Sequence, residues 1–72
     1  MNSSEKNISK HNQLVFEELE KLVETFPVNI EEFETIVQKI EYDEESDQGV
    51  ITNKMENILK KLLMTLLVSF IL

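Results

Sequence analysis

Few side chains of this chain have the types and spacing that catalysis or metal binding requires. The chain carries one histidine, His11, and no cysteine. No acidic residue stands at a spacing from His11 that indicates a catalytic pair, so we expect this side chain to be exposed. No serine lies in a Gly-x-Ser-x-Gly context, and the single glycine, Gly49, is too few for a phosphate-binding loop. The sequence therefore predicts no catalytic, cofactor-binding or metal-binding residue, and we expect the protein not to be an enzyme.

The acidic segment 43–54 resembles a degenerate calcium-binding EF-hand loop. It begins with several acidic side chains, which are followed by Gly49. An EF-hand loop needs a glycine at position 6 and a bidentate glutamate at position 12. Position 12 is Met55 if Gly49 is taken as position 6, and it is Lys54 if Asp43 is taken as position 1. Because neither residue can bind calcium, a solvated acidic loop is favoured, and calcium binding is kept as a minor alternative.

Acidic side chains outnumber basic ones twofold. Fourteen Asp and Glu residues stand against seven lysines, which gives a formal net charge of −7 at pH 7. Proteins that bind nucleic acids need a cationic surface for the phosphates, so we expect no nucleic-acid partner. The acidic side chains either form a solvated face or steer the chain toward a basic protein. The residues expected to form such an acidic surface are Glu17, Glu20, Glu24, Glu31 and Glu34.

Apolar residues recur at spacings of three and four along two segments, which predicts two amphipathic helices. The first is expected at residues 8–25, because Pro27 bars its continuation. The second is expected at residues 30–41, with Asn29 as N-cap and Glu32 three residues later, as in a capping box. The apolar face of the first helix consists of Val15, Phe16, Leu19, Leu22, Val23 and Phe26.

A third helix is expected over residues 53–71. Its start signal is Asn53, with Glu56 three residues later. From Leu62 onward no residue is charged, so this end of the helix is apolar on all sides. The apolar side chains expected to bind a partner are Leu62, Leu63, Leu66, Leu67, Phe70 and Ile71.

The segments outside these helices complete a single domain. Residues 1–7 are polar and are expected to be a flexible N-terminus. Residues 42–52 break the helical period, which predicts an acidic loop in which Gly49 is free to take a positive φ. We therefore expect one helical domain over residues 8–72.

Two short helices cannot cover all sides of the apolar C-terminal end. We expect the surface that they leave to be hidden by a second copy, a different protein or a membrane. The uncharged run covers about 16 Å at 1.5 Å per residue, whereas the hydrocarbon core of a bilayer is roughly 30 Å thick. An ordinary spanning helix is therefore not expected, although residues 58–72 could serve as a short tail anchor.

These observations predict an all-α fold, namely a small three-helix bundle that is completed by dimerisation through its C-terminal helix. We expect that helix to be the most buried of the three. The predicted function is a cytoplasmic, non-enzymatic protein–protein interaction module of the adaptor, inhibitor or antagonist type. Its partner is expected to be another protein or a second copy of itself. The alternative is a membrane-associated protein anchored by residues 58–72.

Overall fold

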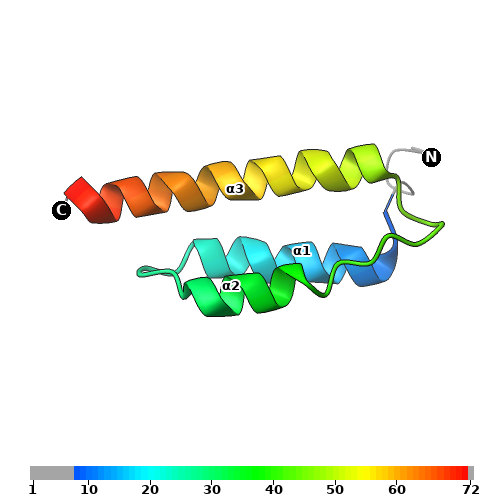
Figure 1. Cartoon of the computed structure of the whole chain (residues 1–72), viewed down its shortest axis with the longest axis horizontal. Coiled ribbons are helices and arrows are strands. Elements are labelled where there is room, and N and C mark those ends of the chain that lie inside the picture. Colours follow the sequence, from blue (N-terminus) through cyan, green and yellow to red (C-terminus); the bar gives the residue numbers. More distant parts are fainter. Residues whose placement is uncertain (1–7, 72) are drawn as a thin grey trace.

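A computed structural model of the chain describes residues 8–71 and shows a bundle of three helices. Helices α1 (Lys10–Val23) and α3 (Gln48–Ile71) run in the same direction, and α2 (Ile30–Val37) runs in the opposite one (Figure 1). The predicted all-α bundle is thereby confirmed. The expectation of a flexible segment at residues 1–7 lies outside the described residues. The molecule measures 44 × 22 × 16 Å, and α3 extends past the ends of the two shorter helices (Figure 1).

The first two helices begin at side chains that accept hydrogen bonds from free backbone N–H groups. Ser9 Oγ accepts from the Asn12 N–H at 3.2 Å, so α1 begins at Lys10 rather than at residue 8. Asn29 Oδ1 accepts from the Glu32 N–H at 3.0 Å, which confirms the predicted N-cap of α2. Each bond satisfies one of the donors that the first helical turn leaves without a partner.

The ends of α1 and α2 come earlier than predicted. Helix α1 ends at Val23 instead of residue 25, and α2 ends at Val37 instead of residue 41. The early end of α2 has a tertiary cause, because Asn12 of α1 binds both the backbone N–H and the backbone C=O of Glu41. These groups are therefore not available to continue the helical ladder.

Helix α3 begins five residues earlier than predicted. Asp47 Oδ1 accepts from the backbone N–H of Gly49 at 2.7 Å and from that of Val50 at 3.3 Å, so Asp47 caps the helix in place of Asn53. The predicted loop at 42–52 is correspondingly shorter. The expectation of a positive φ at Gly49 is wrong, since this residue lies in the first turn of α3 with a negative φ.

Helix α1, not α3, is the most buried helix. It packs against both other helices, whereas no Cα atom of α2 comes within 8 Å of one in α3. Leu19, near the middle of α1, has no exposed surface, while α3 contributes only Ile51 and Ile58 to the buried residues. The core is made by Ile8, Val15, Phe16, Leu19, Val23, Phe33, Ile36, Ile51 and Ile58.

Candidate functional site

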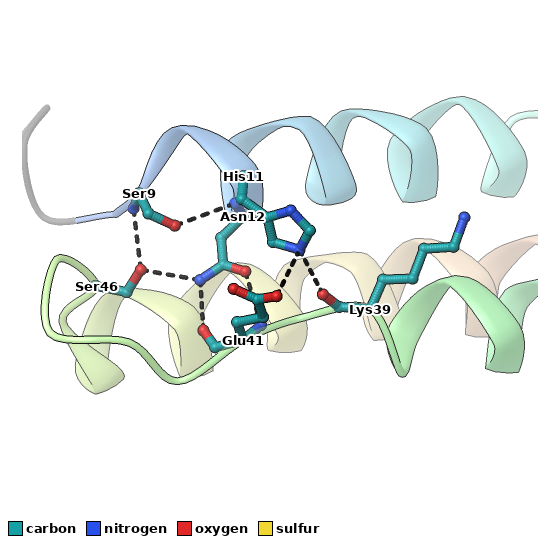
Figure 2. A network of polar contacts seen from close by, with 6 residues as sticks. All are labelled: Ser9, His11, Asn12, Lys39, Glu41 and Ser46. Atoms are coloured by element: carbon teal, nitrogen blue, oxygen red, sulfur yellow. Dashed lines mark hydrogen bonds and ion pairs between the residues drawn. The ribbon is translucent and has the colours of Figure 1, made fainter.

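A cluster of hydrogen bonds ties the loop after α2 to the start of α1 (Figure 2). At its centre is Asn12, which has no exposed surface. Its Nδ2 donates to Glu41 O at 2.6 Å and to Ser46 Oγ at 2.9 Å, and its Oδ1 accepts from the Glu41 N–H at 2.8 Å. Ser46 Oγ also accepts from the Ser9 N–H at 2.9 Å. We call these residues the Asn12 cluster; its bonds hold the loop and leave none of Asn12's polar atoms free.

His11 lies on the exposed side of the Asn12 cluster (Figure 2). Its Nε2 is 2.7 Å from Lys39 O and 3.8 Å from Glu41 Oε2. Because a carbonyl oxygen can only accept, Nε2 carries the proton and donates to Lys39. The prediction that His11 is exposed is confirmed, but the fold gives it an acidic neighbour that the sequence spacing did not reveal. The nitrogen beside that acid is engaged as a donor and is not free to act as a base.

The acidic segment does not have the shape of a calcium-binding loop. Residues 48–54 belong to the first two turns of α3, so only 43–47 remain outside a helix. Within residues 8–71, no three His, Asp or Glu side chains lie close enough together to hold a metal ion.

Asp43 is the acidic residue that the fold perturbs. The Ser46 hydroxyl has the largest effect and lowers the pKa of Asp43 below its ordinary value of 3.8; burial opposes it, and the Ser9 hydroxyl adds a smaller lowering effect. One carboxylate oxygen, Oδ1, is nevertheless buried without a hydrogen-bond partner of good geometry. A lowered pKa in the folded chain means that the ionised form stabilises the fold above the unfolded pKa. This contribution is lost as the pH falls through the folded value.

We therefore expect Asp43→Asn to reduce the loss of thermal stability on acidification. The melting temperature should fall less between about pH 7 and about pH 2 in this variant than in the native chain, because the titrating carboxylate is gone. Thermal unfolding followed by circular dichroism at both pH values measures the difference. Glu44→Gln, which removes an exposed carboxylate one residue away, serves as the control and should behave as the native chain does. An equal acid-induced loss in Asp43→Asn and native chain would contradict this role.

The second feature is the apolar C-terminal part of α3, residues Leu62–Ile71, which we call the α3 tip. No residue of the tip is charged. Leu62 is half-buried against the core, whereas the other five predicted partner-binding residues are exposed. Exposure of the large apolar side chains runs from 42% at Leu66 to 90% at Phe70. The exposed large apolar residues of the tip are Leu63, Met64, Leu66, Leu67, Val68, Phe70 and Ile71.

The tip is exposed because the bundle ends before α3 does. Ile51 and Ile58 are buried seven residues apart, and the next position at this spacing is Thr65. Thr65 Oγ1 donates to the backbone C=O of Val23 at 3.2 Å. Since Val23 is the last residue of α1, α3 continues past this contact without a neighbouring helix (Figure 1).

An open groove of about 550 Å³ lies between the tip and the turn after α1. Val23 and Phe26 line it from the body, and Met64 and Val68 line it from the tip. Phe26, which the sequence places on the apolar face of the first helix, instead lies in the turn and is 56% exposed. The groove therefore extends the apolar surface of the tip onto the body.

The five residues of the predicted acidic surface are all exposed, and Glu17, Glu20 and Glu24 share one face of α1 at spacings of three and four residues. Glu17 and Glu20 line a groove that α1 shares with Lys54 of α3. Glu24 lines the groove beside the tip, and Glu34 lines another between α2 and α3. Glu31 lies in the first turn of α2. Three of the five acidic side chains thus lie along the grooves between α1 and α3, beside Lys54 and Lys61.

Within residues 8–71, none of the three helices combines the length and the apolar character that crossing a membrane requires.

The chain matches no protein-family model, no characterised protein and no solved structure.

Proposed function

We propose that this chain is a non-enzymatic protein-interaction module that binds a partner through the α3 tip. It would act as an adaptor, inhibitor or antagonist in the cytoplasm. The observation that carries the proposal is the exposure of seven large apolar side chains on an uncharged stretch of helix, most of which extends past the last residue of α1. Contiguous apolar surface of this kind marks interaction sites on soluble proteins.

Burial of the tip would release enough free energy to drive association. Each large apolar side chain contributes roughly 1.5–3 kcal/mol when it is transferred from water into a packed interface. Several such side chains together rival the entire stability of a small domain, about 5 kcal/mol at the low end. A helical apolar surface is also a common element of protein recognition, since a partner can accept its side chains in a groove.

A lipid surface is the second candidate, because two lysines, Lys60 and Lys61, directly precede the tip. Lysines at this position can reach lipid headgroups while the apolar residues beyond them enter the bilayer. The tip is only about 15 Å long, half the hydrocarbon thickness of a bilayer. A single experiment therefore has to separate binding to protein from binding to lipid.

Site-specific photocrosslinking makes this distinction. Benzoylphenylalanine placed at Leu67, which is 52% exposed, should give a discrete protein adduct in the cell of origin, and mass spectrometry of the adduct identifies the crosslinked segment. The same probe at Leu14, an equally exposed leucine on α1, should give none. Adding Leu66→Asp should abolish the adduct from position 67, because a carboxylate in the apolar interface costs several kcal/mol.

Two results would overturn the proposal. The first is the absence of any protein adduct while the native chain co-floats with phosphatidylcholine vesicles, which would assign the tip to lipid. The second is the absence of both, with circular dichroism confirming that the probe-bearing chain is folded.

A further inference from the structure

We infer that the partner of the α3 tip is a basic amphipathic helix of another protein, which lies in the groove between α2 and α3 and continues along the tip. This inference rests on the proposed function, since it names the chemistry of the protein that the tip binds. Three observations support it: the separation of α2 from α3, the apolar flank of α3 beside their groove, and the sign of the charges around that groove.

Helices α2 and α3 are separated by an open groove. Both pack against α1, yet no Cα atom of α2 comes within 8 Å of one in α3. The groove has a volume of about 430 Å³, with Phe33 and Val37 on the α2 side and Met55 and Leu59 on the α3 side. In a four-helix bundle each helix packs against two neighbours, so a helix diagonally opposite α1 would rest on α2 and α3. The groove therefore lies where a fourth helix would complete such a bundle.

The flank of α3 beside this groove is apolar from the body to the end of the tip. Its apolar residues are Met55, Leu59, Leu62, Leu63, Leu66 and Phe70. At 100° per residue they lie within about 100° of one another around the helix, and they extend over about 23 Å. Met55 and Leu62 are half-buried against the core, whereas the other four are 42% to 90% exposed. A helix bound in the groove can thus contact apolar side chains along its whole length.

The charges around the groove are mainly acidic. Glu34 lines it on α2, and Glu56 lies at its outer edge on α3, next to Leu59 around the helix. Glu31 and Lys60, which lie farther out, have opposite signs. One end of the groove is bordered by the segment that joins α2 to α3 (Figure 1), and residues 38–47 of this segment carry five acidic residues and one lysine. Lysine or arginine beside the apolar face of a bound helix would therefore complement these charges.

The same charges disfavour a second copy of the chain in the groove. Each copy has a formal net charge of −7, so the acidic groups around the groove would approach another acidic molecule. A cationic helix is instead attracted before contact, which raises the rate of association.

The larger groove beside Phe26 is a separate surface. Met64 and Val68 of that groove lie on the opposite flank of α3, at 100° per residue. Its two charged residues, Glu24 and Lys61, have opposite signs, so this groove does not favour a partner of either charge. It therefore supplies a control for tests of the groove between α2 and α3.

Binding of a synthetic helix tests the inference. The probe is a fluorescent peptide of about 18 leucine and lysine residues, whose leucines all lie on one helical face and which is about 27 Å long as a helix. Its fluorescence anisotropy should rise and saturate as the full-length chain is added. A peptide of the same composition with its leucines distributed around the helix should bind about tenfold more weakly, because fewer of them reach the groove.

Two matched variants locate the binding site. Leu59→Gln removes an apolar contact from the groove and should raise the Kd of the peptide about tenfold or more. Met64→Gln makes the same kind of change on the opposite flank, where the side chain is 66% exposed, and should change the Kd by less than about twofold. Neither residue belongs to the core, so circular dichroism should show native helix content for both variants.

Reversal of charge tests the sign of the partner. The double variant Glu34→Lys, Glu56→Lys should bind the leucine–lysine peptide about tenfold more weakly, and it should bind a leucine–glutamate peptide more tightly than the native chain does. The double variant Glu17→Lys, Glu20→Lys makes the same change of net charge on α1 and should keep the native preference. Equal weakening in the two double variants would show that net charge alone attracts the peptide, and the inference would be wrong.

The inference is also overturned if the native chain does not bind the leucine–lysine peptide, or if Leu59→Gln and Met64→Gln weaken binding equally. A native mass of twice 8.4 kDa in light scattering, reduced to the single-chain mass by Leu59→Gln, would assign the groove to a second copy instead. The photocrosslinking probe at Leu67 reports on the proposed function separately. A protein adduct at Leu67 without peptide binding would leave the proposed function in place, whereas the absence of an adduct would remove that function whatever the peptide does.

Discussion

Leu19→Ala is expected to lower the free energy of unfolding by about 2–5 kcal/mol, a large part of the stability of a small domain. Leu19 has no exposed surface and lies on α1, which packs against both other helices. The truncated side chain leaves a cavity in the core, and the surrounding side chains relax only partly to fill it. Because a domain of this size has only about 5 kcal/mol at the low end, the variant should be partly or wholly unfolded at room temperature.

Urea unfolding followed by circular dichroism measures this loss, at one protein concentration so that association does not differ between samples. Leu14→Ala is the matched control, because the same residue type on the same helix is 52% exposed. It should change the free energy of unfolding by less than about 0.5 kcal/mol. A loss below about 1 kcal/mol in Leu19→Ala would show that α1 is not the helix on which the core depends.

The central position of α1 illustrates the limit of the sequence pattern. Apolar periodicity and local caps predicted three helices correctly, and Asn29 was identified as an N-cap because its bond to Glu32 is local. All three helices have an apolar face, however, and periodicity does not say which of them lies between the others. The pattern predicts that the most apolar helix is the most buried, yet α3 buries only Ile51 and Ile58 in the core.

The predicted helix boundaries are wrong where a competing cap or a distant hydrogen bond sets the end of the helix. Both Asp47 and Asn53 are good capping residues, and the first is used because Ile51 then joins α3 on the same side as Ile58. The end of α2 is set by Asn12, which lies 29 residues before Glu41 in the chain. A contact at this separation leaves no local signal in the sequence.

The exposure of the α3 tip could be predicted, because it follows from the number of apolar sides that the helix has and the number of helices available to cover them. An apolar stretch without charges from Leu62 onward has more sides than two short helices can cover. The extra length of α3 beyond Val23 adds a reason that the pattern did not give, since the bundle stops at Thr65 and the helix does not. The groove beside Phe26 could not be foreseen, because it depends on how the turn after α1 places that ring.

Asn12→Ala is expected to cost about 2–4 kcal/mol of unfolding free energy, because it leaves two backbone groups of Glu41 without their partner and removes one of the two hydrogen bonds that the Ser46 hydroxyl accepts. In a sequence-based account Asn12 is one more polar residue near the N-terminus. In the fold it is fully buried and is the residue that turns the chain from α2 toward α3. Hydrogen exchange at the Glu41 amide should accelerate in this variant, since that N–H loses its acceptor.

Asn57→Ala is the control for Asn12→Ala, because it removes an exposed asparagine from the interior of α3 and should leave stability within about 0.5 kcal/mol of native. Asn12→Asp separates the two halves of the interaction. It keeps the acceptor for the Glu41 N–H, but it replaces the donor that reaches Glu41 O with an oxygen, which is repelled there. Asn12→Asp should therefore lower the free energy of unfolding, while the Glu41 amide stays protected from hydrogen exchange. Equal stability of the Asn12→Ala and native chains would show that the loop is held by α3 and the core instead of by this side chain.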